Sequence, residues 1–84
     1  MKIYELINNF DIKLYGDANI EIEGITYDSR KVRKNYLFVA LHGSKDDGKN
    51  YIKDAILRGA VAVLTDDKTI KYDNTVFLTT NDIS

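Results

Sequence analysis

Two short, almost continuously apolar segments restrict the folds that this chain can adopt. They are Tyr36–Leu41 (YLFVAL) and Ala60–Leu64 (AVAVL). Strands with apolar side chains on both faces need cover on both faces, which is typical of a parallel sheet flanked by helices. Between them, Tyr51–Arg58 places apolar side chains at helical spacing and is followed by Gly59, a residue that often ends helices. Strand, helix and strand at this spacing predict a parallel βαβ unit.

The flanking residues predict further, shorter elements. Lys2–Phe10 carries one apolar stripe at helical spacing and predicts a first helix. Alternating apolar residues predict a strand at Ile12–Tyr15 and another over residues 20–25, with Gly24 as a candidate bulge. Residues Thr75–Leu78 predict a last strand. The expected fold is α/β: one small three-layer α/β/α domain over residues 1–84, with a short mixed sheet that contains the parallel βαβ unit.

The composition excludes several classes of function. The 84 residues include no cysteine and one histidine, which excludes disulfides, thiol catalysis and metal sites built from Cys or several His. Twelve basic against thirteen acidic residues give a formal net charge of −1, so neither nucleic acid nor a membrane is an expected partner. The N-terminus is no signal peptide, and no apolar run approaches the roughly 20 residues of a membrane helix. A soluble cytoplasmic protein is therefore expected.

The stretch Gly43–Asn50 (GSKDDGKN) contains most of a phosphate-binding P-loop, G-x-x-x-x-G-K-[ST], between a predicted strand and a predicted helix. Asn50 replaces the hydroxyl residue that binds Mg²⁺ in such loops, and its amide oxygen is a poorer ligand. Asp46 and Asp47 would place two carboxylates beside the phosphates, where like charges repel. A surface loop that ends in a helix cap at Asp47 fits every residue, so we do not predict an ATP site here.

The segments on both sides of this loop carry a family resemblance. In order, they are DSRKV at 28–32, LFVAL-x-G at 37–43, DG-x-x-YI at 47–52 and AI-x-x-GAVAV at 55–63. This ordered set resembles the N-terminal domain of the Mur ligases, the ATP-dependent enzymes that add amino acids to the peptidoglycan precursor. The resemblance covers about half of the chain, and the remaining residues fit as flanking structure.

Within the family, the segments are most similar to the ligase that adds the third amino acid to UDP-N-acetylmuramoyl-L-alanyl-D-glutamate (UDP-MurNAc-L-Ala-D-Glu). The resemblance implies that this domain holds the uridine diphosphate (UDP) end of that substrate. The contacts that it implies are Tyr27, Ser29, Ser44, Lys45 and Asp46. It also implies a longer enzyme whose central and C-terminal domains bind ATP, Mg²⁺ and the incoming amino acid. The 84-residue fragment is then not catalytic by itself and is expected to hold no cofactor or metal.

The residues alone leave other interpretations open. Ser29 and Asp28 are also suited to local turn hydrogen bonds, Tyr27 to packing, and Arg30 to an ion pair with Asp28. The Mur ligase that adds D-alanyl-D-alanine has a similar domain and is the nearest alternative. A stand-alone uridine-nucleotide-binding module and a small phosphotransferase that uses Lys49 are two more, which the sequence after Ser84 and an ATP-turnover assay would separate.

Overall fold

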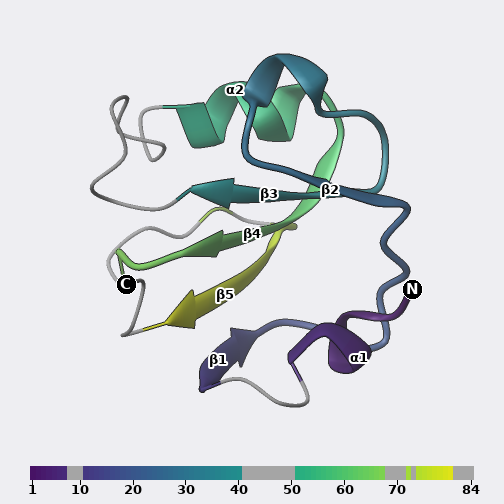
Figure 1. Cartoon of the computed structure of the whole chain (residues 1–84), viewed down its shortest axis with the longest axis vertical. Coiled ribbons are helices and arrows are strands. Elements are labelled where there is room, and N and C mark those ends of the chain that lie inside the picture. The colour runs from purple at the N-terminus through teal and green to yellow at the C-terminus, as the bar shows by residue number, and fades with distance from the viewer. Residues whose placement is uncertain (8–10, 41–50, 68–71, 73, 81–84) are drawn as a thin grey trace.

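The computed structural model describes residues 1–7, 11–40, 51–67, 72 and 74–80. Within them, five strands form one sheet in the order β1-β5-β4-β3-β2, and β1 is antiparallel to β5 while the other neighbours are parallel. In Figure 1, helix α2 lies above this sheet and helix α1 below it. The elements are α1 (Ile3–Ile7), β1 (Ile12–Tyr15), β2 (Gly24–Thr26), the 3₁₀ helix η1 (Ser29–Lys31), β3 (Tyr36–Ala40), α2 (Ile52–Leu57), β4 (Ala60–Thr65) and β5 (Val76–Thr80).

Two apolar cores, one on each face of the sheet, make the fold three-layered. Because neighbouring residues of a strand point to opposite faces, each apolar strand supplies both cores. The core under α2 contains Val32, Phe38, Ala40, Ile52, Ala55, Ala60, Val63 and Phe77. The core under α1 contains Ile3, Ile22, Leu37, Ala62, Val76 and Leu78. The predicted α/β class, the mixed sheet and the parallel β3–α2–β4 unit are confirmed.

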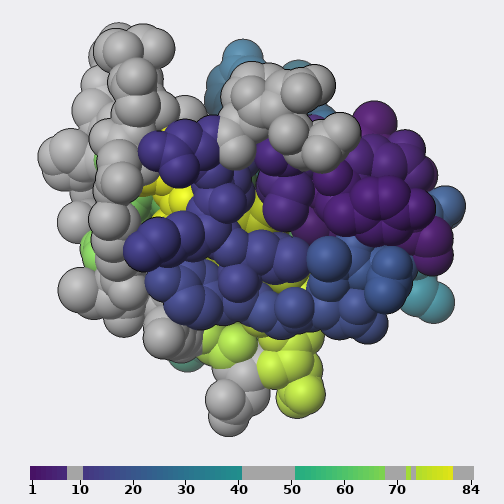
Figure 2. Space-filling model, turned by 90° about the horizontal axis from the view of Figure 1, so that it is seen from below, coloured from purple at the N-terminus to yellow at the C-terminus, as the bar shows by residue number. Residues whose placement is uncertain are grey.

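The N-terminal quarter of the chain covers the lower side of the sheet. Figure 2 shows these residues, in purple to blue, spread over the side opposite α2. The backbone N–H of Ile3 donates to the carbonyl of Ile20 at 3.1 Å, and Glu21 forms an isolated antiparallel bridge with Lys2. The predicted strand over residues 20–25 is therefore wrong in its first half, because that backbone bonds to the N-terminal segment. The regular strand β2 begins at Gly24.

Gly24 is not a bulge, because β2 pairs with β3 in continuous register. The ring of Tyr36 lies over it, and a Cβ at Gly24 would come within 2.5 Å of Tyr36 Cζ. The irregularity lies on the other side of β3, where Tyr36 pairs with Ala60 but Leu37 pairs with Ala62. Gly24 therefore makes room for an aromatic ring.

Helix α2 ends as the sequence predicts. Arg58 is its C-cap, and Gly59 follows with φ +119°, a value that L side chains rarely adopt. The predicted N-cap, Asp47, lies outside the described residues, and Tyr51 occupies the N-cap position without a side-chain hydrogen bond. In the part of the chain that the structure describes, no helix has the length and apolar character to cross a membrane.

Candidate functional site at the carboxyl edge of the sheet

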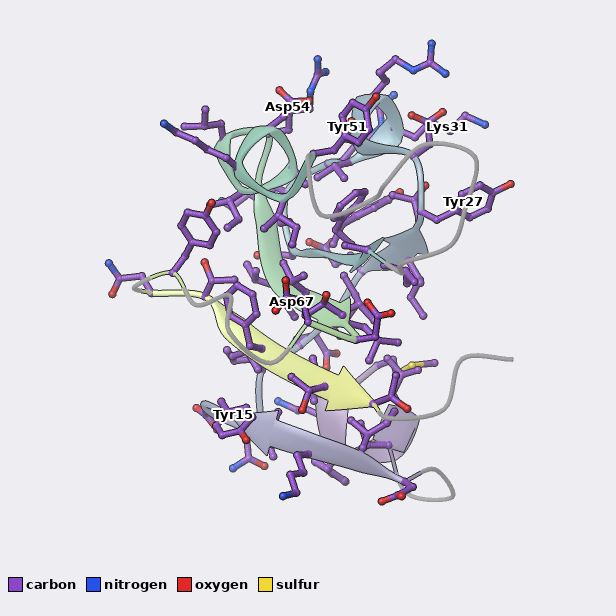
Figure 3. All side chains as sticks on the ribbon, turned by 90° about the vertical axis from the view of Figure 1, so that its left-hand side faces the viewer. Tyr15, Tyr27, Lys31, Tyr51, Asp54 and Asp67 are labelled. Atoms are coloured by element: carbon purple, nitrogen blue, oxygen red, sulfur yellow. The ribbon has the colours of Figure 1, made fainter. Side chains whose placement is uncertain are left out.

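The parallel strands β2, β3, β4 and β5 all end at the same edge of the sheet, which Figure 3 views from the front. We call it the carboxyl edge. In open α/β sheets, ligands bind outside this edge, where the chain leaves each strand. Residues 27–31 follow β2 there, and residues 41–50 follow its neighbour β3. The ends of β2 and β3, after which the two predicted contact segments follow in the sequence, therefore lie side by side, and residues 41–50 themselves lie outside the described residues.

The turn after β2 is closed by the carboxylate of Asp28. Asp28 has extended backbone angles (φ −108°, ψ 112°) and is the N-cap of η1, accepting the N–H of Arg30 at 3.0 Å. The same carboxylate accepts Nε of Arg30 at 3.1 Å and, on its other oxygen, Nη2 at 3.1 Å. Behind it, the N–H of Asp28 donates to Oγ1 of Thr26, the last residue of β2, at 3.1 Å. Hydrogen bonds on both sides thus fix the turn.

This turn sends the two predicted contact residues in opposite directions. Tyr27 is 84% exposed and points away from the sheet in Figure 3, so the packing alternative for it is wrong. Ser29, in contrast, is only 7% exposed. The side-chain oxygen that caps η1 belongs to Asp28, so Ser29 does not take the N-cap role.

The pairing of Asp28 with Arg30 sets the charge of the turn. The hydrogen bonds from Arg30 hold the pKa of the Asp28 carboxyl below its ordinary value, and the same bonds raise the pKa of Arg30. The predicted pairing of Arg30 with Asp28 is confirmed. The Asp28 side chain is 23% exposed while that of Arg30 is 81% exposed. Because a guanidinium has five N–H donors, Arg30 can meet a further anion while it holds Asp28.

The carboxyl edge also contains threonines that the sequence analysis did not single out. Thr65 and Thr79 end the apolar runs of β4 and β5, and both are buried. Oγ1 of Thr65 accepts the N–H of Asp67 at 3.1 Å. The signal available in the sequence was a threonine at the carboxyl end of an otherwise apolar strand, but such residues are also common in ordinary strands.

No group of three or more His, Asp or Glu side chains gathers among the described residues. The three loop contacts Ser44, Lys45 and Asp46 lie outside those residues, as do Lys49 and Asn50, so their roles stay predictions. The residue types in Gly43–Asn50 therefore remain the only ground for predicting no ATP site there.

Comparison with known proteins decides the family. The family model described as "Mur ligase family, catalytic domain" matches residues 21–83 of this chain. The chain belongs to the Mur ligase family. The predicted family resemblance is thus confirmed.

The curated relatives carry a more specific name. The Mur ligase UDP-N-acetylmuramoyl-L-alanyl-D-glutamate–2,6-diaminopimelate ligase 2 of Clostridium acetobutylicum is 48% identical over 68 residues, covering 80% of this chain and 14% of the relative. The 2,6-diaminopimelate ligase of the same type from Rhizobium meliloti is 55% identical over 69 residues, covering 76% and 14%. The chain therefore spans about a seventh of the length of these Mur ligases.

Solved structures show the same fold. MurF from Acinetobacter baumannii superposes with a TM-score of 0.81 over 96% of this chain and 18% of that one, at 19% identity. A MurF ligase from Thermotoga maritima in complex with ADP gives a TM-score of 0.58 over 69% and 13%, at 29% identity. The three-layer domain described above is thus a fold found within Mur ligases.

Proposed function

We propose that this chain binds the uridine diphosphate end of UDP-MurNAc-L-Ala-D-Glu within an ATP-dependent ligase. That ligase adds the third amino acid of the peptidoglycan stem peptide. The observation that carries the proposal is the Asp28-Ser29-Arg30 turn at the carboxyl edge, where the end of β2 lies beside the end of β3. The names of the curated relatives, which specify this uridine-linked substrate, supply its identity.

The described side chains suit the two halves of a nucleoside diphosphate. The exposed ring of Tyr27 offers an aromatic face on which a uracil can stack. The hydroxyl of Ser29, which follows β2 at the carboxyl edge, can donate to a phosphate or uracil oxygen. In the loop, backbone groups of Ser44 and Asp46 are proposed to meet the uracil edge, and Lys45 to offset phosphate charge.

ATP and Mg²⁺ are assigned to the rest of the proposed ligase. Asn50 stands where a P-loop needs a hydroxyl, which makes the Gly43–Asn50 loop a poor site for ATP and Mg²⁺. The choice of amino acid likewise belongs to parts of the ligase other than this chain. The proposed partners of the domain are therefore the uridine-linked substrate and the central and C-terminal domains of the same ligase.

Titration of the isotope-labelled chain with UDP tests the proposal by NMR. We expect a dissociation constant of about 1 mM, because other domains supply part of the pocket. The chemical-shift changes should gather at residues 27–30 and 43–47, and ADP with Mg²⁺ should bind more weakly. Preferred binding of ADP, or shift changes confined to other elements, would refute the proposal.

The second candidate is the same domain of the Mur ligase that adds D-alanyl-D-alanine. The likeness to the MurF structures, with a TM-score up to 0.81, favours it as far as fold is concerned. The identities of 48% and 55% to diaminopimelate ligases favour the first candidate. Assays of the ligase that contains this chain with diaminopimelate, L-lysine and D-alanyl-D-alanine distinguish the two. UDP binding by the chain without ligase activity toward any of these amino acids would instead indicate a stand-alone uridine-nucleotide-binding module.

A further inference from the structure

We propose that Asp28 is a positioning residue for the UDP site. Its hydrogen bonds with Arg30 fix the conformation of the turn in which Ser29 is buried and Tyr27 is exposed. The inference rests on the proposed function and goes beyond it, because neither Asp28 nor Arg30 is among the predicted contacts. In this inference, Asp28 and Arg30 of the DSR segment hold the backbone of Ser29 in place.

The first support is the number of hydrogen bonds that one carboxylate makes. Asp28 accepts a backbone N–H and two guanidinium N–H groups, all from Arg30 and all at 3.0–3.1 Å. The carbonyl of Asp28 also accepts the N–H of Lys31 at 2.9 Å, which completes the single turn of η1. We call the hydrogen-bonded pair of Asp28 and Arg30 the clamp. Ser29 lies between these two residues in the sequence, so its backbone cannot rotate without breaking several of these bonds.

The second support is where the clamp lies. The Asp28–Arg30 pair is on the surface, and neither residue belongs to the two apolar cores. Exposed ion pairs contribute little to the stability of a fold. The clamp instead controls the local geometry of a turn at the carboxyl edge. A contact group that is misplaced there weakens ligand binding even when the fold is intact.

The chain contains a matched control for this pair. On α2, Nε of Arg58 donates to Asp54 at 3.0 Å in an i,i+4 ion pair whose side chains are also partly exposed. Asp54→Asn removes the same charge from the same kind of pair, but on a helix surface and not in the turn after β2. A general effect of net charge on binding the anionic ligand would appear equally in both variants.

The test compares UDP binding by the wild-type chain, Asp28→Asn and Asp54→Asn, with unfolding in urea measured in parallel. Asn keeps one oxygen that can accept the backbone N–H of Arg30, but it loses the two charged hydrogen bonds between carboxylate and guanidinium. We therefore expect the Kd for UDP to rise about five- to tenfold in Asp28→Asn. Asp54→Asn should leave it unchanged within about twofold. Arg30→Lys keeps the positive charge but loses the planar guanidinium that binds both carboxylate oxygens, so it should weaken UDP binding by a similar factor. It provides the measurement if Asp28→Asn does not fold.

In the ligase that contains the chain, a positioning role predicts a raised KM for the uridine-linked substrate with kcat and the KM for ATP unchanged. A lower stability with an unchanged Kd and KM in Asp28→Asn would show a merely structural role and overturn the inference. Equal losses in Asp28→Asn and Asp54→Asn would also overturn it. Failure of the wild-type chain to bind UDP would refute the proposed function itself, which is a different result.

Discussion

Thr65 and Thr79 are register partners on the neighbouring parallel strands β4 and β5, but their buried hydroxyls differ in hydrogen bonding. Both point to the face covered by α2, because each lies two residues after a member of that core. Oγ1 of Thr65 accepts the N–H of Asp67 at 3.1 Å, whereas Oγ1 of Thr79 has no hydrogen-bond partner within the described residues. A buried hydroxyl without a partner loses its hydration and gains nothing in return.

Replacing Thr79 by valine should therefore stabilise the chain. Valine keeps the branched shape and removes the unsatisfied hydroxyl, so we expect the free energy of unfolding to rise by about 1–3 kcal/mol. Thr65→Val is the matched control and should lower it by about 0.5–1.5 kcal/mol, because it breaks the bond to Asp67. Urea unfolding of both variants measures the difference. A destabilised Thr79→Val variant would mean that the Thr79 hydroxyl has a partner in solution.

The core under α2 depends on Ile52 more than on its neighbours in the helix. Ile52 is fully buried, Ile56 packs only partly against the same core, and Leu57 is 78% exposed. Ile52→Ala should cost about 2–5 kcal/mol, which for a domain of this size approaches the total stability. Leu57→Ala should change the free energy of unfolding by no more than about 0.5 kcal/mol.

If Ile52→Ala does not fold, Ile52→Val provides the measurement, with an expected cost of about 0.5–1.5 kcal/mol. Thermal unfolding followed by circular dichroism is sufficient for the comparison. Equal effects of the substitutions at Ile52 and Leu57 would show that α2 does not pack in the observed orientation.

The end of α2 predicts a different kind of sensitivity. At Gly59, φ is +119° and a Cβ would lie 2.8 Å from the backbone Cα of Lys34, so Gly59→Ala should cost more than about 1 kcal/mol. Gly16 has a similar φ of +132°, but its nearest neighbour is a methyl group of Val76 at 2.9 Å, which can move more easily than backbone. Gly16→Ala should therefore cost less in urea unfolding. The reverse order would contradict the described contact between Gly59 and Lys34.

Much of the central fold could be predicted from sequence because its signals are local and agree with one another. The apolar runs that became β3 and β4 and the helical spacing of α2 predict the same unit, and Gly59 marks the join. The predicted strand over residues 20–25 failed for a non-local reason. Its alternating pattern is real, and Ile22 is buried, but the backbone there bonds to the N-terminal segment.

The site could be predicted only in part. The family resemblance indicated which segments hold the contacts, and the parallel pairing of β2 with β3 places the ends of both strands at one edge. It did not show which of two adjacent polar residues would cap η1. Asp28 and Ser29 are both good caps, and the choice depends on the backbone angles at Asp28, which the surrounding fold sets. The exposure of Tyr27 and the burial of Ser29 follow from that choice.

The Asp28–Arg30 pair should make stability depend on acid pH. Because the pKa of Asp28 is lowered in the folded chain, its contribution is fully present above its ordinary value of 3.8 and is lost as the pH falls through the folded pKa. The difference in free energy of unfolding between wild type and Asp28→Asn should therefore narrow as the pH falls below about 4. Urea titrations at several pH values measure it. A difference that stays constant with pH would show that the carboxylate charge is not involved.

Ser29→Ala should separate binding from folding. Ser29→Ala leaves the Asp28 cap of η1 in place, so it should lower the free energy of unfolding by no more than about 1 kcal/mol. If it donates to an ionised phosphate, its removal should cost about 1.5–3 kcal/mol of binding, or roughly ten- to hundredfold.

Because UDP binds the isolated chain weakly, the Ser29→Ala measurement belongs in the ligase that contains it. There, the KM for the uridine-linked substrate should rise while kcat changes little, since the uridine end is remote from the reacting carboxylate. Thr79→Val serves as the control, because it also removes one buried hydroxyl but lies outside the proposed contacts. An unchanged KM in Ser29→Ala, or an equal rise in Thr79→Val, would show that Ser29 does not contact the substrate.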